Sequence, residues 1–306
     1  MIATSSSPTV LDMRDVTRRF GDTIALDNIS LSVPRGIVFG LVGVNGSGKT
    51  TLIKHVLGLL RAQTGSVRVF DRDPVADPVG VLSRIGYLSE ENDLPPWMTV
   101  AELIRYTRAF YPGWRDDFAE QLRRRFGLDL AARIGTLSKG QQARAGLLVA
   151  LAYRPELLVL DEPSSGLDPL VRRDILGAII RTVADEGRTV LFSSHLLDEM
   201  ERVVDRVAMI DGGRIVLSAT MDDLQASHRR LTLRFEEART QPPALAGALA
   251  WEGTGHEWSA VCHGPAEELH AAAATVGGRI VEEHGVGLDE IFVARMGRTA
   301  AAVEQE

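Results

Sequence analysis

The segment from Gly43 to Thr50, Gly-Val-Asn-Gly-Ser-Gly-Lys-Thr, has the residue types and spacing needed to hold a chain of phosphates. Its glycines let the backbone curl so that successive N–H groups point inward at an anion. The apolar run from Ile37 to Val42 precedes it and predicts a buried strand, and the run from Thr51 to Leu57 predicts the start of a helix. This order of strand, glycine-rich turn and helix is the context that a phosphate-binding P-loop requires.

Two residues at the end of this segment supply its chemistry. Lys49 can reach the β- and γ-phosphates of a nucleoside triphosphate, and the hydroxyl of Thr50 can ligate Mg²⁺. An ordinary glycine-rich turn is a poor alternative, because every fixed position of the motif is filled and both flanks fit. The residues expected to contact nucleotide here are Gly43, Val44, Asn45, Gly46, Ser47, Gly48, Lys49, Thr50 and Thr51.

A second candidate site follows about a hundred residues later. The run from Leu157 to Leu160 predicts a strand covered on both faces, and it ends in Asp161 and Glu162. Ligands of open α/β sheets bind at the carboxyl ends of the strands, so this acidic pair is expected to face the phosphates. We expect Asp161 to hold Mg²⁺ and Glu162 to orient or deprotonate the attacking water. A solvated turn would not need two carboxylates directly after four aliphatic residues.

Three further segments surround this strand in a fixed order. Leu137 to Gln141 precedes it, Ser164 to Pro169 follows it, and His195 comes after the next apolar run, Thr189 to Ser193. Each segment is weak by itself, but with the P-loop they resemble the ATP-binding cassette (ABC) ATPases over about residues 9–222. In that resemblance, Leu137 to Gln141 corresponds to the signature motif, Ser165 to Asp168 to the D-loop, and His195 to the switch histidine.

The resemblance implies an α/β fold, the P-loop NTPase cassette of ABC proteins, with a mixed sheet core, an antiparallel edge sheet and a helical subdomain. It implies ATP and Mg²⁺ as ligands and a dimer in which each signature motif completes the partner's ATP site. It also implies catalytic roles for Glu162, His195 and Glu90, and Mg²⁺ contacts for Thr50, Asp161 and Glu90. The further residues that it implies in nucleotide binding are Phe20, Ser138, Gly140, Gln141 and Asp168.

Three positions depart from the usual cassette pattern. Lys139 stands where the signature motif normally has glycine, and its charge lies either near the partner's triphosphate or on the surface. Glu90, with Glu91 next to it, takes the place of a glutamine that touches Mg²⁺ and water; a carboxylate still ligates Mg²⁺ but adds negative charge beside the γ-phosphate. Phe20 stands where tyrosine is commoner. It either stacks on adenine or packs in the core at a strand end.

Composition limits the class of protein. The chain has 306 residues, a net charge of −7 and one cysteine, Cys262. This charge does not suggest nucleic-acid binding, and the cysteine count excludes an internal disulfide framework and favours a reducing compartment. The segment from Met1 to Pro8 lacks the pattern of a signal peptide, and no apolar stretch approaches the ~20 residues of a membrane span. We therefore expect a cytoplasmic chain that is soluble alone.

The hydrophobic pattern divides the chain into two domains. We expect a cassette over residues 9–225 and a small α+β accessory domain over residues 226–306. A helical subdomain is expected at about residues 90–140, with Thr99 and Glu102 as a capping box. The other predicted elements are strands at 10–20, 29–33, 65–70, 231–235 and 279–283, a hairpin at 206–217, and helices at 141–152, 168–184 and 265–276.

The leading functional hypothesis is the ATPase subunit of a bacterial ABC exporter of the ABC-2 type. Its partners would be transmembrane permease subunits, which hold it at the inner face of the membrane, and a second cassette. The run from Leu94 to Met98 carries Trp97, which is expected either to dock on the permease or to pack inward on the helical subdomain. The alternatives are an importer ATPase, or a soluble ABC ATPase that acts on DNA or the ribosome. The sequence does not name the transported substrate.

Overall fold

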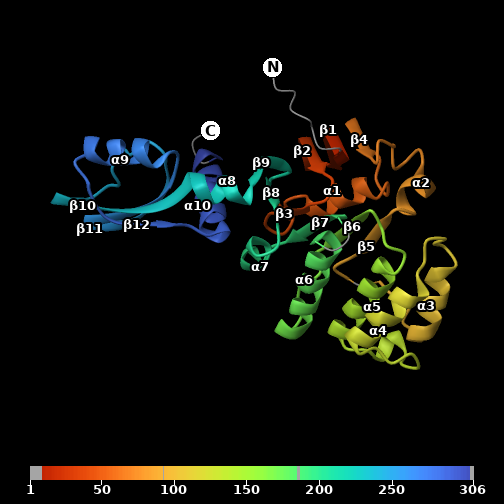
Figure 1. Cartoon of the computed structure of the whole chain (residues 1–306). Coiled ribbons are helices and arrows are strands. Elements are labelled where there is room, and N and C mark those ends of the chain that lie inside the picture. The colour runs from red at the N-terminus through yellow and green to blue at the C-terminus, as the bar shows by residue number, and fades with distance from the viewer. Residues whose placement is uncertain (1–8, 92, 185–186, 304–306) are drawn as a thin grey trace, which may run out of the picture. The chain divides into compact units, whose positions relative to one another are not determined.

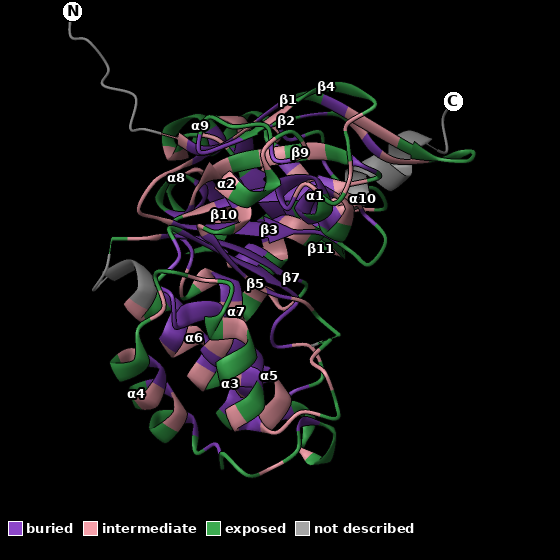
Figure 2. Ribbon diagram, turned by 90° about the vertical axis from the view of Figure 1, so that its right-hand side faces the viewer, coloured by how far each residue is buried: buried purple, intermediate pink, exposed green. Residues whose placement is uncertain are grey.

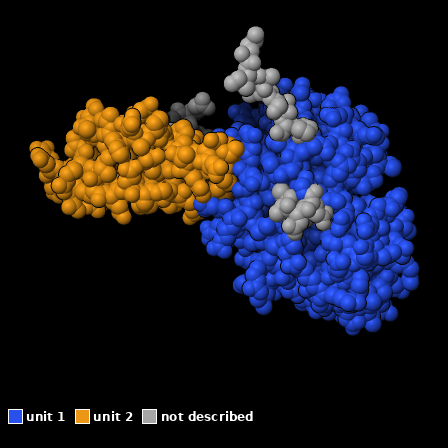
Figure 3. Space-filling model, in the orientation of Figure 1, with its two compact units in different colours: residues 1–218 blue, residues 219–306 orange. Residues whose placement is uncertain are grey.

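A computed structural model of the chain describes residues 9–91, 93–184 and 187–303. The chain divides into two compact units, residues 1–218 and 219–306 (Figure 3). This boundary lies before the one expected from the sequence, between residues 225 and 226, because α8 (Met221–Ser227) packs within the second unit. The polar segment from Met1 to Pro8 lies outside the described residues.

A six-stranded sheet forms the centre of unit 1 (Figure 1). Its order is β5-β6-β7-β3-β8-β9, and the pairs β5–β6, β6–β7, β7–β3 and β3–β8 are parallel. The strands are β3 (Val38–Val42), β5 (Ile85–Leu88), β6 (Leu157–Asp161), β7 (Thr189–Ser194), β8 (Arg206–Asp211) and β9 (Arg214–Thr220). β3, β6 and β7 are buried at every position, as continuous apolar runs predict for strands covered on both faces (Figure 2).

The parallel register brings the chemistry-bearing segments to one edge of this sheet. Val42 is paired with Ser194, and Asp161 is paired with Ser193, so β3, β6 and β7 end side by side. The P-loop, the acidic pair and the histidine each follow one of these strand ends. The helices that continue from this edge are α1 (Lys49–Val56), α6 (Pro169–Ala184) and α7 (Leu197–Glu201).

Unit 1 also contains an antiparallel sheet of three strands in the order β2-β1-β4. The strands are β1 (Thr9–Phe20), β2 (Thr23–Pro34) and β4 (Thr64–Val69), which confirms the antiparallel edge sheet expected from the sequence. Phe20 is the last residue of β1, and 46% of it is exposed. The alternative that Phe20 is a core residue is therefore wrong.

The remaining helices of unit 1 are α2 (Pro78–Leu82), α3 (Val100–Arg108), α4 (Asp116–Phe126), the short 3-10 helix η1 (Ile134–Thr136) and α5 (Lys139–Leu151). The predicted capping box begins α3: Glu102 N–H donates to Thr99 Oγ1 at 3.2 Å, and Thr99 N–H donates to Glu102 Oε2 at 2.9 Å. Trp97 precedes this helix and is 67% exposed, so the alternative that it packs inward is wrong.

Unit 2 contains one antiparallel sheet in the order β11-β10-β12. Its elements are α8, β10 (His228–Arg239), β11 (Ala248–His263), α9 (Ala266–Thr275), β12 (Arg279–Gly285) and α10 (Leu288–Val303). Leu231, Leu233 and Phe235 of β10 face a core shared with α9. The sequence did not predict β11, because Gly253, Gly255 and the polar residues around them hide its alternation. Across the described residues of both units, no helix is long and apolar enough to cross a membrane.

Candidate nucleotide site

The P-loop joins β3 to α1 through backbone conformations that suit glycine. Gly46 and Gly48 have φ values of 81° and 115°, in the region that other residues rarely adopt. A Cβ on Gly43 would lie 2.4 Å from the carbonyl oxygen of Ile210 and 2.4 Å from Ser47 Oγ, so only glycine fits there. No side chain caps the N-terminus of α1. Its first N–H groups are therefore available to an anion.

Lys49 is held inside this loop. Its Nζ donates to the carbonyl oxygens of Gly43 and Val44 at 2.7 and 3.2 Å. The same Nζ lies 3.2 Å from Oε1 of Glu162, and the two residues are each 5% exposed. The P-loop lysine and the carboxylate at the end of β6 thus form a buried ion pair.

Glu162 is the centre of the site. Its φ is 48°, a left-handed conformation that costs free energy in a residue with a side chain and that often marks functional positions. Its N–H donates to the carbonyl oxygen and Oγ of Ser193 at 3.1 and 3.0 Å. Its Oε2 lies 2.7 Å from Nδ1 of His195 and accepts the His195 backbone N–H at 3.2 Å. The two oxygens therefore face different partners, Lys49 and His195.

Asp161 lies beside this pair and is almost fully buried. Ser193 Oγ donates to its Oδ1 at 2.7 Å. Burial raises the pKa of the Asp161 carboxyl above its ordinary value; hydrogen bonds from Ser193 and Thr50 oppose the rise, and the carboxylates of Glu162 and Glu90 add to it. A carboxylate that is destabilised in this way gains from a nearby cation.

The side chains next to Asp161 suit a hard cation, because Thr50 contributes a hydroxyl and the acidic residues contribute carboxylates. Among the described residues, no group of three or more His, Cys, Asp or Glu side chains is arranged to hold a metal by itself. Magnesium in nucleotide sites uses one or two carboxylates together with phosphate oxygens and water. The donor set therefore fits Mg²⁺ that arrives with a nucleotide.

A hollow of about 230 Å³ opens in front of these residues. It brings the P-loop together with Glu90 and Glu162, which are far apart in the sequence. Its lining residues are Asn45, Gly46, Gly48, Lys49, Thr50, Thr51, Glu90 and Glu162. The arrangement can hold a triphosphate on the loop with a carboxylate beside the terminal phosphate.

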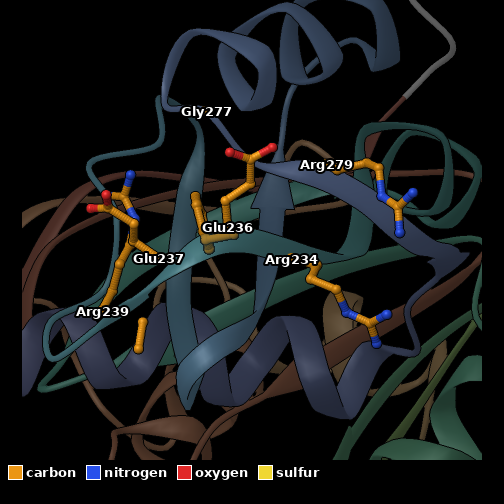
Figure 4. A pocket seen from close by; sticks show the side chains of 8 residues that line it. Arg234, Glu236, Glu237, Arg239, Gly277 and Arg279 are labelled. Atoms are coloured by element: carbon orange, nitrogen blue, oxygen red, sulfur yellow. The ribbon is translucent and has the colours of Figure 1, made fainter.

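A larger hollow, of about 620 Å³, lies in unit 2 at the end of β10 (Figure 4). Two of its lining arginines contact an acidic residue or a backbone oxygen. Arg234 pairs with Glu257 at 2.7 Å, and Arg239 donates to the carbonyl oxygen of Val276 at 2.9 Å. The side chains of Glu236 and Glu237 also border it. The larger volume of this hollow does not by itself make it a nucleotide site. The P-loop hollow has the lysine, hydroxyl and carboxylate groups that phosphates and a cation require.

The signature segment lies at the start of α5 and is not part of the lining of the P-loop hollow. Ser138 Oγ accepts the N–H of Gln141 at 3.2 Å, and Gln141 Oε1 accepts the N–H of Ser138 at 3.0 Å. A Cβ on Gly140 would lie 2.6 Å from Cγ2 of Val171, so this glycine lets α5 approach α6 closely. Asp168 Oδ1 accepts the N–H groups of Leu170 and Val171 and caps α6.

Lys139 and Phe20 also lie outside the described lining of that hollow. Lys139 is exposed, and its Nζ would lie 2.9 Å from a Cβ placed on Gly166 of the D-loop segment. The ring of Phe20 is covered by the guanidinium of Arg18 at 4.7 Å. The expected contact of Phe20 with adenine stays a prediction.

Sequence reasoning missed the role of Ser193. This residue hydrogen-bonds both to Asp161 and to Glu162, so it fixes the two carboxyl residues relative to β7. The sequence signal was the polar residue Ser193 directly after the apolar run from Val190 to Phe192. A buried hydroxyl needs a hydrogen-bond partner, and the acidic pair on the adjacent strand supplies it.

Comparisons with known proteins agree with this geometry. Residues 26–165 match the protein family described as ABC transporter. The daunorubicin/doxorubicin resistance ATP-binding protein DrrA of Streptomyces peucetius is 34% identical, over 78% of this chain and 75% of its own length. The ABC transporter ATP-binding protein YtrB of Bacillus subtilis is 25% identical, over 94% of this chain and 98% of its own length.

Solved structures show the same fold. The structure of an ATP-binding subunit of an ABC transporter has a TM-score of 0.66 and 28% identity, and it covers 71% of this chain and 92% of that chain. A dimeric bacterial ABC transporter cassette, MJ0796, has a TM-score of 0.62 at 22% identity and shows the fold alone. These matches confirm the cassette fold and the ATP-binding P-loop expected from the sequence. The chain therefore belongs to the ATP-binding proteins of ABC transporters, and it is an ATPase of that family.

Proposed function

We propose that this chain is the ATP-hydrolysing subunit of an ABC exporter, at the inner face of the cell membrane. The observation that carries the proposal is the buried ion pair of Lys49 and Glu162 beside the P-loop, together with the contact of Glu162 with His195. The names of relatives favour export: DrrA is a drug-resistance protein, and YbhF of Escherichia coli, 34% identical over 38% of its length, is a probable multidrug transporter subunit.

In the proposed mechanism, the P-loop N–H groups and Lys49 bind the β- and γ-phosphates of ATP. Glu162 orients the attacking water and accepts its proton, which places a general base next to the γ-phosphate. His195 holds the Glu162 carboxylate through the 2.7 Å contact with Oε2. Thr50, Asp161 and Glu90 would hold Mg²⁺, which neutralises charge that develops on the phosphates.

Two cassettes are proposed to close over two ATP molecules. Ser138, Gly140, Gln141 and Asp168 do not line the described hollow of their own chain. Ser138 caps the N–H of Gln141 at the start of α5, and this helix end carries the partial positive charge of a helix N-terminus and the charge of Lys139, both of which favour an anion. We propose that it completes the site of a second cassette, with Phe20 against the adenine of its own site.

The permease is proposed to dock on an apolar face of unit 1. An apolar hollow of about 340 Å³ is lined by Leu57, Leu59, Leu82, Ile85, Tyr87, Thr107, Tyr111, Val149, Ala150 and Tyr153. Tyr106 of α3, Phe110 just after this helix and Trp97 before it are more than half exposed, and the rings of Tyr106 and Phe110 pack edge to face. Exposed apolar groups in this number favour a protein partner.

Co-purification with the polytopic protein encoded beside this chain tests the docking proposal. Trp97→Ala should weaken the association and leave the ATPase rate of the isolated chain unchanged, because Trp97 does not line the nucleotide hollow. Val79→Ala, which trims another exposed apolar side chain, is the control and should co-purify normally. Recovery of the wild type with ribosomes or DNA, and not with the permease, would favour the soluble-ATPase alternative. Uptake rather than efflux by the assembled transporter would favour the importer.

A further inference from the structure

Arg172 of α6 contacts two segments of the nucleotide site at once. Its Nε donates to the carbonyl oxygen of Leu167 at 2.8 Å, and its Nη1 donates to Oε1 of Glu199 at 3.4 Å. Leu167 lies in the segment after β6, and Glu199 lies in α7, in the segment after β7. One guanidinium therefore joins the segments that follow two neighbouring strands.

These two segments carry the proposed catalytic pair. Glu162 begins the first segment and His195 begins the second, and their side chains meet at 2.7 Å. The first segment is tightly turned, because Ser165 N–H donates to the carbonyl oxygen of Glu162 at 3.1 Å and Leu167 N–H donates to that of Ser164 at 3.2 Å. These hydrogen bonds leave the backbone between Glu162 and Leu167 little freedom, so a displacement of Leu167 also displaces Glu162.

Arg172 is one of the contacts that hold the second segment, together with the buried side chain of Met200 in α7. α7 has only five residues and no side-chain cap, so it is too short to be stable by itself. The Glu199 side chain is 15% exposed, and its Oε2 is buried without a hydrogen-bond partner. Arg172 is the described partner of the other oxygen. A largely buried carboxylate that loses its cation is costly, so the contact helps to hold the helix that follows His195.

The fold of α6 has a separate anchor. Arg144 of α5 pairs with Asp174 of α6 at 2.7 Å, and Val171 and Ile175 of α6 are buried. The helix therefore stays packed when the contacts of Arg172 are removed. What the Arg172 contacts add is the relative placement of the two segments that begin at Glu162 and His195.

We propose that Arg172 is a positioning residue for ATP hydrolysis, which holds the Glu162–His195 pair in register across β6 and β7. The inference rests on the proposed roles of Glu162 and His195. Arg172 touches neither residue and does not line the described hollow. It acts through the two segments, so its loss changes the rate of the chemical step and leaves nucleotide binding intact.

The first test is steady-state ATPase kinetics of Arg172→Met. We expect kcat to fall about 10- to 100-fold, as small misplacements of catalytic groups do, with KM for ATP unchanged. Arg173→Met, which removes the neighbouring exposed arginine, is the control and should keep the wild-type kcat. A wild-type kcat for Arg172→Met, or a loss that appears as a raised KM, would overturn the proposal. If Arg172→Met does not fold, Arg172→Lys, which can reach one partner at a time, should give an intermediate kcat, and a wild-type kcat would refute it.

The second test separates positioning from general stability. Glu199→Gln should lower kcat in the wild type and have no further effect in a His195→Ala background, because the contact acts through the segment that carries His195. An equal fold loss in both backgrounds would show a merely structural role and overturn the proposal. Glu162→Gln is measured in parallel. Normal turnover of Glu162→Gln overturns the proposed catalytic base, whereas normal turnover of Arg172→Met with an inactive Glu162→Gln overturns the Arg172 proposal alone.

Discussion

In the proposed mechanism, the phosphates of ATP compete with Glu162 for the charge of Lys49. Nζ of Lys49 lies 3.2 Å from Oε1 of Glu162, and each of the two side chains is only 6% exposed. At this distance, the Coulomb attraction is about 5 kcal/mol for an effective dielectric constant of about 20. We therefore predict that Glu162→Gln binds ATP more tightly than the wild type, although it removes the proposed catalytic base.

The size of this gain follows from the nucleotide-free state. Removing one partner of a buried ion pair costs ~3–5 kcal/mol, because the other charge is left without compensation. In the variant, Lys49 keeps its two carbonyl acceptors, and water in the hollow also solvates its charge. We therefore take ~1.4 kcal/mol as the part of this cost that ATP removes when it binds, which is about tenfold in Kd. The uncompensated lysine should also lower the thermal midpoint of the nucleotide-free variant.

Isothermal titration with Mg-ATP measures this prediction. Glu268→Gln is the matched control, because it removes one exposed carboxylate from α9 of the other unit and should leave the Kd unchanged. An unchanged or weaker affinity for Glu162→Gln would refute the reasoning that the ion pair competes with the phosphates. A tighter affinity in the control as well would assign the effect to net charge.

Three further predictions concern other parts of the chain. Phe20→Leu should weaken ATP binding by ~0.5–1.5 kcal/mol if the ring stacks on adenine, and Phe20→Tyr should not; titration with ATP decides. Gly43→Ala should abolish nucleotide binding, because its Cβ would lie 2.4 Å from the Ile210 carbonyl oxygen; equilibrium dialysis with ATP measures the loss. Burial, with help from the charges of Arg295 and His263, lowers the pKa of His228 to about 4. The folded state therefore keeps this imidazole neutral while the unfolded state takes up a proton below about pH 6.5, and unit 2 should lose up to ~3 kcal/mol between pH 6.5 and 4. His228→Gln should flatten this part of the pH profile in urea unfolding, and an unchanged profile would contradict the assignment.

The sequence predicted the parts of the site that lie in continuous segments. The P-loop, the acidic pair and His195 each follow an apolar run, so local pattern places them at strand ends. The parallel register then brings them to one edge. The family resemblance supplied the order of the segments, which local pattern alone does not.

Other features depend on tertiary contacts and were not predictable from local pattern. The Lys49–Glu162 ion pair joins the first residue of α1 to the residue that follows β6, and the bridge from Arg172 to Glu199 joins two helices. Neither pairing has a signature in residue spacing. For Phe20 and Trp97 the sequence left an accessible and a packed alternative open, and the structure shows that both side chains are exposed.

The central claim, that Glu162 is the base of a P-loop ATPase, is tested most directly by phosphate release from Mg-ATP. Wild type and Glu162→Gln are compared at saturating ATP, with binding measured on the same samples. We predict that the variant loses ~10²–10⁴-fold in turnover while it still binds ATP, because the group that accepts the water proton is gone. Near-normal phosphate release by the folded, ATP-bound variant would contradict it.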